Sequence, residues 1–167
     1  MKLLIHDLTE KEFKKIFPSV PRDIVVLSPA QRIHPCIGCF GCWVNTPAYC
    51  IIRDDYQQLG DVFSKVSELI LISKCCYGGF SPFVKNALDR AIPYMLPFYE
   101  VRNNAVNLSK RYENRIHISA HFYGELISPE EERIASLLVE ANTMNINGSG
   151  STVAFYCDKS ALKGVMI

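Results

Sequence analysis

The sequence has 167 residues and a formal net charge of +1; 49% of its residues are hydrophobic and 21% are charged. This length and composition predict one globular domain over residues 1–167 with a substantial core. The near-zero charge excludes the basic surface of a nucleic-acid-binding protein, and no apolar run approaches the roughly 20 residues that cross a bilayer. We therefore expect neither a nucleic-acid partner nor a membrane partner.

The N-terminus and the cysteines bear on the compartment. The opening MKLLIHDLTEKEF has a short apolar stretch that His6 and Asp7 interrupt, which is not the pattern of a signal peptide. We therefore expect a cytoplasmic protein. In that reducing compartment the seven cysteines are predicted to be thiols, metal ligands or redox groups, and not a disulfide framework.

Apolar stretches alternate with amphipathic ones, and their periodicity assigns each to a strand or a helix. In chain order we predict a strand over residues 2–8, a helix over 9–17, a strand over 23–29, a helix from Asp54 or Asp55 to about 68, a strand over 69–76, a helix over 82–92, an irregular segment over 93–114, a strand over 115–122, a helix over 128–142 and a strand over 151–158. Five strands interleaved with helices predict a parallel, doubly wound sheet.

Two helix starts carry capping signatures. Thr9 with Glu12, and Ser128 with Glu131, have the spacing of capping boxes, and Pro129 suits a first helical position. Both helices are therefore expected to begin at these residues.

The loops after the second and third strands should carry the function, because ligands of doubly wound sheets bind outside the carboxyl ends of the strands. A cysteine-rich segment follows the second strand, and residues 74–81 follow the third. We expect both at that edge. The apolar and aromatic residues 92–99 are either an interface patch or part of the domain's own core.

Four cysteines in the stretch CIGCFGCWVNTPAYC have the spacing C-x2-C-x2-C-x7-C. Thiolates at this spacing can converge on one soft centre, either an iron–sulfur cluster or a zinc ion. The alternative is that they are ordinary loop residues, since free cysteine often serves as a small buried hydrophobe. The four residues are Cys36, Cys39, Cys42 and Cys50.

Over residues 33–157 the sequence resembles the flavodoxin-like NADPH-dependent FMN reductase family, in particular its iron–sulfur flavoprotein-like branch. The resemblance is carried by CIGCFGCW (36–43), Cys50, Asp54-Asp55, SKCCYGGFS (73–81), Lys85 with Leu88-Asp89-Arg90, FYGE (122–125) and EANTMNI (140–146). It implies a flavodoxin-like three-layer α/β/α sandwich with a five-stranded parallel sheet. It also implies a homodimer or a homotetramer.

The resemblance further implies an FMN-dependent NAD(P)H oxidoreductase, in which hydride passes from the nicotinamide to the flavin and then to a quinone, another flavin or an electron carrier. A 4Fe-4S cluster would be held by the four cysteines. The loop after the third strand would cradle the flavin ring through Ser73, Cys75, Cys76, Tyr77, Gly78, Gly79 and Ser81. The alternative for Gly78-Gly79 is a turn that needs glycine, and for Cys75-Cys76 a structural pair. Asp89 and Arg90 are expected to pair on the helix surface.

The N-terminus departs from the family pattern. Members place a Gly/Ser-rich loop after the first strand to hold the FMN phosphate, whereas this chain has Asp7-Leu8-Thr9-Glu10. Two carboxylates would repel a phosphate dianion, so we expect the standard phosphate site to be missing. Two other functions therefore stay open: a scaffold or partner subunit that has lost flavin binding, and a cysteine-ligated iron–sulfur electron-transfer protein.

Overall fold

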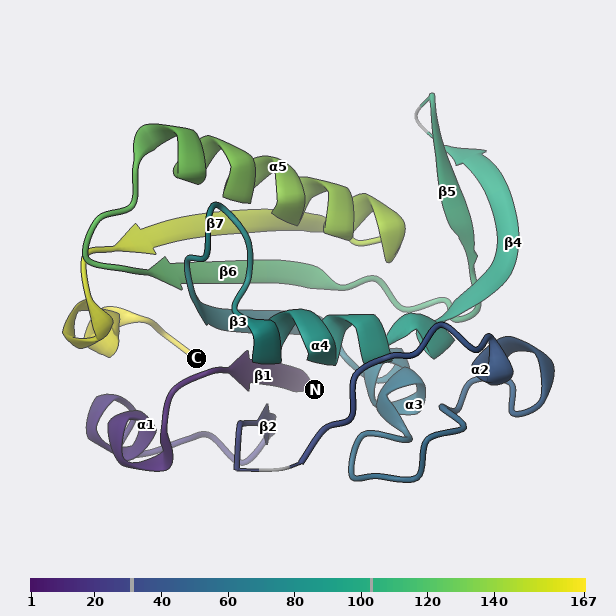
Figure 1. The fold of residues 1–167 in the computed structure, drawn as a ribbon, viewed down its shortest axis with the longest axis horizontal. Helices are drawn as coiled ribbons and strands as arrows, with labels where there is room; N and C mark the ends of the chain where they lie inside the picture. The colour runs from purple at the N-terminus through teal and green to yellow at the C-terminus, as the bar shows by residue number, and fades with distance from the viewer. Residues whose placement is uncertain (31, 103) are drawn as a thin grey trace.

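The computed structural model describes residues 1–30, 32–102 and 104–167. A five-stranded sheet has the order β2-β1-β3-β6-β7, and every neighbouring pair in it is parallel. This is the strand order of flavodoxin-like proteins, and helices cover both faces of the sheet (Figure 1). The predicted three-layer sandwich is therefore confirmed. Its strands are β1 (Lys2–His6), β2 (Ile24–Leu27), β3 (Glu68–Lys74), β6 (His117–Tyr123) and β7 (Gly150–Tyr156).

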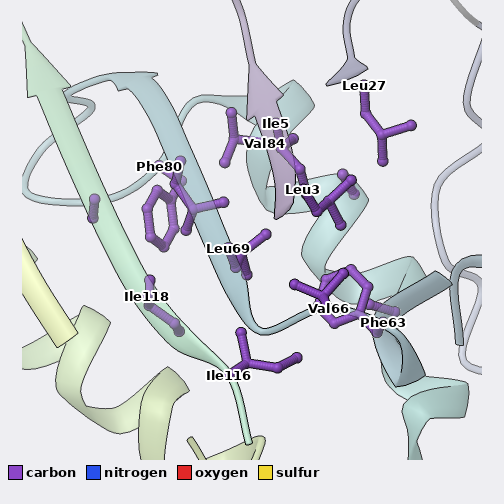
Figure 2. Packing of buried hydrophobic residues seen from close by; sticks show 14 of the residues in the cluster. Leu3, Ile5, Leu27, Phe63, Val66, Leu69, Phe80, Val84, Ile116 and Ile118 are labelled. Atoms are coloured by element: carbon purple, nitrogen blue, oxygen red, sulfur yellow. The ribbon is translucent and has the colours of Figure 1, made fainter. Parts of the chain in front are cut away.

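The two faces of the sheet bury separate apolar clusters, because successive side chains of a strand point to opposite sides. Leu3 and Ile5 belong to the cluster under α3, α4 and α5, part of which Figure 2 shows, whereas Leu4 belongs to the cluster under α1 and η2. β3 is buried on both faces, as its apolar run predicts. The helices are α1 (Glu10–Ile16), α3 (Leu59–Ser64), α4 (Pro82–Arg90), α5 (Pro129–Asn145) and the 3-10 helix η2 (Lys159–Gly164).

The predicted capping boxes are both present. Thr9 and Ser128 are the N-caps of α1 and α5, and each side chain accepts a hydrogen bond from the backbone of Glu12 or Glu131, whose carboxylate accepts from the cap in return. Pro129 occupies the first turn of α5. These local signals are therefore sufficient to place both helix starts.

The prediction of an irregular segment over residues 93–114 is wrong. A 3-10 turn, η1 (Ile92–Tyr94), leads into an antiparallel hairpin of β4 (Met95–Arg102) and β5 (Ala105–Lys110). Pro93 and Pro97 hide the strand pattern, and the register shifts between Met95 and Tyr99. Asn104, with φ +62°, was the available turn signal, since asparagine tolerates this conformation.

Residues 92–99 divide between the two expected roles. Tyr94 and Met95 are buried in the domain's own core. Phe98 and Tyr99 lie on the projecting hairpin and are 64% and 75% exposed. The interface patch therefore stays a prediction for the second half of this stretch only.

The helix predicted from Asp54 or Asp55 to about residue 68 is much shorter, since α3 covers only Leu59–Ser64. Asp54 does not cap it; its carboxylate accepts a hydrogen bond from the Tyr56 backbone and forms an ion pair with Arg90. The other predicted elements are present, with ends displaced by a few residues. Within the described parts of the chain, no helix has the length and apolarity that a membrane crossing requires.

His6 ends β1 as a buried, neutral imidazole. Its ring stacks on Phe13 with centroids 4.1 Å apart, and only 1% of the residue is exposed. Burial lowers the pKa of His6 to about 4, although the neighbouring Asp7 opposes the shift. The folded protein therefore resists protonation of this ring at pH values where the unfolded chain accepts the proton.

We predict that His6 makes stability fall as the pH drops from 6.5 to about 4. In that window only the unfolded state takes up the proton. The free energy of unfolding should therefore fall by on the order of 3 kcal/mol across it. His6→Phe keeps a ring against Phe13 and removes the titration, so it should flatten this part of the profile. Urea unfolding of both proteins across this pH window measures the free energy of unfolding. If that free energy falls equally in the wild type and in His6→Phe, His6 is not the titrating group.

Candidate functional site

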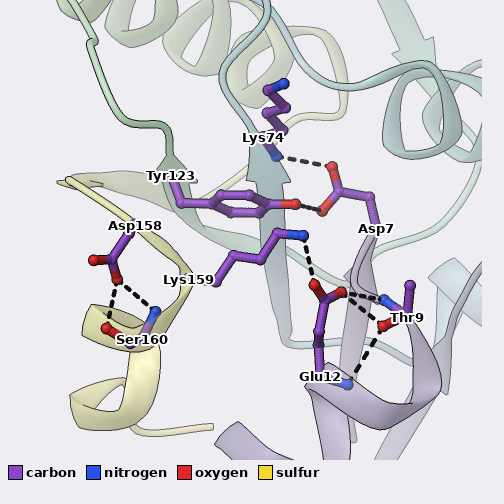
Figure 3. A network of polar contacts seen from close by, with 8 residues as sticks. All are labelled: Asp7, Thr9, Glu12, Lys74, Tyr123, Asp158, Lys159 and Ser160. Atoms are coloured by element: carbon purple, nitrogen blue, oxygen red, sulfur yellow. Dashed lines mark hydrogen bonds and ion pairs between the residues drawn. The ribbon is translucent and has the colours of Figure 1, made fainter.

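The carboxyl edge of the sheet is tied together by one carboxylate. Asp7, directly after β1, accepts a hydrogen bond from the backbone N–H of Lys74 at the end of β3 (2.8 Å) and from the hydroxyl of Tyr123 at the end of β6 (2.9 Å). Burial raises the pKa of Tyr123, and Asp7 adds to the rise, so the phenol stays protonated and continues to donate. Three adjacent strands are thereby joined (Figure 3).

A second carboxylate fills the N-terminus of α1. Glu12 accepts hydrogen bonds from the backbone N–H and the hydroxyl of Thr9, at 2.9 and 2.7 Å. Lys159 of η2 reaches across to it, with 2.8 Å between the ammonium and the carboxylate (Figure 3). The hydrogen bonds from Lys159 and Thr9 lower the pKa of Glu12 to about 2. Glu12 is therefore anionic throughout the neutral range.

The same arrangement recurs at two other helix starts of this edge, those of α5 and η2, whereas the N-cap of α4, Ser81, makes no side-chain capping hydrogen bond. Glu131 occupies the N-terminus of α5, and Asp158 accepts from the backbone N–H groups of Ser160 (2.6 Å) and Ala161 (3.1 Å) at the start of η2. A helix N-terminus can bind phosphate because its first N–H groups lack partners. At these three starts a carboxylate of the chain accepts from one or two such groups: Thr9 at α1, Ser128 at α5, and Ser160 with Ala161 at η2.

An FMN phosphate therefore does not fit the switch point between β1 and β3, where flavodoxin-like sheets bind FMN. A dianion there would approach both the Glu12 carboxylate at the start of α1 and the Asp7 carboxylate. The geometry agrees with the expectation that the standard phosphate site is missing. Both carboxylates belong to the folded scaffold, so the misfit is built into the fold.

The loop expected to cradle the flavin ring, residues 73–81, lies at this carboxyl edge and is called the ring-side loop below. All seven predicted contact residues are in it. Its tip is a tight turn in which Cys76 and Gly79 exchange backbone hydrogen bonds of 2.9 and 2.8 Å, with φ +53° at Tyr77 and +77° at Gly78. Tyr77 is 93% exposed. The loop thus presents one aromatic ring to solvent on a rigid turn.

The base of the ring-side loop is closed by its own hydrogen bonds. The backbone N–H of Ser81 donates to the Ser73 hydroxyl (2.8 Å), and that of Cys75 donates to the Tyr123 carbonyl (2.9 Å). Burial raises the pKa of the Cys75 thiol, and the Gly78 backbone N–H, which donates to it, partly opposes the rise. Cys75 is therefore a thiol near neutral pH, and not a reactive thiolate.

Gly78 has a structural role in addition to any contact with a ligand. A Cβ added there would lie 2.7 Å from Cβ of Ile134 and 3.1 Å from the Glu131 carbonyl oxygen, both in α5. The left-handed turn and this close approach both require glycine. The expectation of a turn that needs glycine therefore has direct geometric support.

A hollow of about 660 Å³ lies beside the network. Sequence reasoning named none of its side chains as a site, although several directly follow a strand of the parallel sheet. That position was the available signal. The hollow is lined by Lys74, Tyr123, Gly124, Glu125, Asp158, Lys159 and Ser160.

The cysteine-rich segment lies at the opposite edge, so the expectation that it joins the carboxyl edge is wrong. After β2 the chain runs back along α4, and the short helix α2 (Gly41–Val44) lies beside η1 (Figure 1). Trp43 is anchored there by a 3.0 Å hydrogen bond to the Met95 carbonyl. Its indole therefore holds the segment to the scaffold.

A buried ion pair fixes this path. Arg90, at the end of α4, donates to both carboxylate oxygens of Asp54 and to the carbonyl of His34, each at 2.7 Å. Burial opposes ionisation of Asp54, but the hydrogen bonds from Arg90, His34 and Tyr56 hold the pKa of this carboxyl below its ordinary value. The predicted pairing of Asp89 with Arg90 is wrong, since Asp89 pairs with the exposed Lys85.

The four cysteines line one cavity of about 920 Å³ that extends between α4, α5 and the hairpin. Burial and the neighbouring Cys50 raise the pKa of Cys42 to about 11. Among the described residues, no three His, Cys, Asp or Glu side chains converge closely enough to hold a metal ion. The geometry thus gives no support to a cluster on Cys36, Cys39, Cys42 and Cys50, which stays a prediction.

The strand order and the position of the loops define a flavodoxin-like α/β protein. The azoreductase AzrA aligns with a TM-score of 0.53 at 7% identity, over 96% of this chain and 88% of AzrA. An FMN-dependent NADH-azoreductase from Bacillus anthracis, in complex with FMN, gives 0.51 at 8% identity over 95% and 88% of the two chains. General stress protein 14 from Treponema denticola, also with FMN, gives 0.53 at 8% over 97% and 91%.

No protein-family model and no curated protein matches the sequence. At identities this low, the likeness to solved structures concerns the fold alone. The expected resemblance to flavodoxin-like FMN reductases is confirmed at that level.

We predict that Arg90→Leu lowers the free energy of unfolding by about 3–5 kcal/mol, because it leaves the Asp54 carboxylate buried without its ion pair. Lys85→Leu is the matched control on the same helix; it breaks the exposed pair with Asp89 and should change stability by less than about 1 kcal/mol. Urea unfolding measures both. Equal losses of free energy of unfolding in the two variants would show that the buried ion pair stabilises the fold no more than the exposed one.

We predict that Gly78→Ala destabilises the protein by about 2 kcal/mol or more, since it adds a side chain at positive φ against Ile134. Gly79→Ala is the control: its added Cβ would meet only the Cys76 carbonyl, at 3.2 Å, and should cost less than about 1 kcal/mol. Thermal unfolding of the two variants tests the difference. A milder effect at Gly78 than at Gly79 would contradict the close approach to α5.

Proposed function

We propose that this protein is a flavin-dependent oxidoreductase, which passes electrons from NAD(P)H to a small redox acceptor such as a quinone, another flavin or an electron carrier. One observation carries the proposal. The ring-side loop, with all seven expected contact residues, lies at the carboxyl edge beside the switch point of a flavodoxin-ordered sheet. The names of the FMN-dependent structural neighbours support the same class of chemistry.

The proposal concerns the ring and not the phosphate of a flavin. An exposed Tyr77 on a rigid turn is a suitable stacking surface for a planar ring. Because the phosphate does not fit the start of α1, no catalytic step is assigned to a bound FMN. The residues that this proposal commits to are those of the ring-side loop.

A second candidate is favoured by the closed helix starts. Glu12, Glu131 and Asp158 each place a carboxylate on backbone N–H groups at the start of a helix, where a phosphate would be repelled. Such an edge suits a flavodoxin-like scaffold or partner subunit without flavin. The two candidates differ in whether the purified protein retains a flavin.

We predict that protein purified without oxygen and incubated with riboflavin or FMN retains two-banded flavin absorption after the free ligand is removed. Tyr77→Asn, which tolerates the positive φ but lacks the ring, should weaken retention about tenfold. Tyr99→Asn is the control. It removes an exposed tyrosine from the hairpin, far from the ring-side loop, and should leave flavin retention unchanged. A colourless wild-type protein would reject the flavoenzyme and favour the scaffold.

A further inference from the structure

We infer that the carboxyl edge selects a flavin without its phosphate, so that riboflavin binds at least as tightly as FMN; this inference rests on the proposed function. The charges and hydrogen bonds at this edge, and not the fold alone, determine which flavin it accepts.

The first step is that the chain provides its own anion at the start of α1. The Glu12 carboxylate already holds the backbone N–H of Thr9 and the ammonium of Lys159. A phosphate at this N-terminus would lie beside the Glu12 carboxylate, which the capping box and the ion pair with Lys159 hold in place. Repulsion by this carboxylate therefore opposes the attraction of the helix N-terminus for an anion.

The second step is that the remaining charge around the hollow is unfavourable to a dianion. Asp7 and Glu12 belong to the network, and Glu125 and Asp158 line the hollow. Against these carboxylates stand two ammonium groups. That of Lys159 is directed at Glu12 and lies 5.5 Å from the centre of the Tyr123 ring. The side chain of Lys74 extends away from the network (Figure 3).

The third step is that the same groups suit a neutral, hydroxyl-rich ligand. Carboxylates are acceptors, and the ribityl hydroxyls of riboflavin are donors, so Glu125 at the hollow offers favourable partners without charge repulsion. The isoalloxazine ring needs an apolar or aromatic surface. Tyr77 presents one outside the hollow, three residues after Lys74, which lines it. Removing the phosphate thus removes the repulsion and leaves the contacts.

The test compares the dissociation constants of riboflavin, FMN and lumiflavin, measured by quenching of flavin fluorescence at physiological salt. We expect riboflavin to bind as tightly as FMN or more tightly. Glu12→Gln keeps a residue that can form the capping box but removes one negative charge. It should tighten FMN by about three- to tenfold, from Coulomb repulsion reduced by salt screening, and leave riboflavin unchanged.

Glu10→Gln is the matched control. It removes the same charge from the first turn of the same helix. The sequence suggests that Glu10 would repel a phosphate, but in the structure its side chain is 70% exposed and pairs with Lys14, so its charge is screened by solvent and by that partner. The ratio of the FMN and riboflavin constants should not change in this variant. An equal change in both variants would mean that net charge acts, and not the Glu12 site.

The outcomes separate the inference from the function. If wild-type protein binds FMN tenfold or more tightly than riboflavin, the inference is overturned and the flavoenzyme stands. If it binds none of the three flavins, the proposed function fails, and the inference fails with it. If Glu12→Gln leaves FMN binding unchanged or shifts both flavins equally, the electrostatic account is wrong.

Discussion

The Asp7 carboxylate joins the ends of three neighbouring strands at the edge where a doubly wound sheet binds its ligands. A buried parallel sheet ends in N–H groups that need acceptors, and water or a ligand usually supplies some of them. Here the end of β3 is satisfied from within, by a side chain that also holds the Tyr123 hydroxyl. The carboxyl edge is consequently ordered before any ligand arrives, and its charge is fixed by the chain.

At the opposite edge of the sheet, a buried ion pair holds the cysteine-rich segment in place. Arg90 and Asp54 form a buried, bidentate ion pair that fastens the cysteine-rich segment to the end of α4. Breaking one partner of such a pair is costly because the other stays buried and charged. The cavity that the four cysteines line nevertheless extends to Gly79 and Phe80 of the ring-side loop.

Local signals in the sequence were sufficient for most of the fold. The apolar run of β3 and the capping boxes of α1 and α5 depend on neighbouring residues only, and the structure contains all of them. What could not be predicted depends on long-range contacts. Asp54 resembles a helix cap until Arg90, 36 residues later, is known to be its partner, and β4 is hidden by Pro97.

The candidate site likewise has one part that the sequence predicts and one part that depends on long-range contacts. The ring-side loop is one continuous segment, so its residues could be named together from the sequence. The hollow beside it draws on β3, β6 and η2, and Lys159 meets Glu12 across 147 positions. Nothing near Lys159 in the sequence indicates that contact.

AzrA has a similar fold to this chain but only 7% sequence identity with it. Within one topology, ligand binding depends on the site and not on the fold, and the N–H groups at helix starts are one part of such a site. In this protein Glu12 does two things at once. A helix of seven residues is marginal alone, and the capping box stabilises it. The same carboxylate places a negative charge beside the N-terminus of α1, where it repels a phosphate. Stability of α1 and exclusion of an anion therefore have one physical cause, so a change that opens the site to phosphate must also replace the cap.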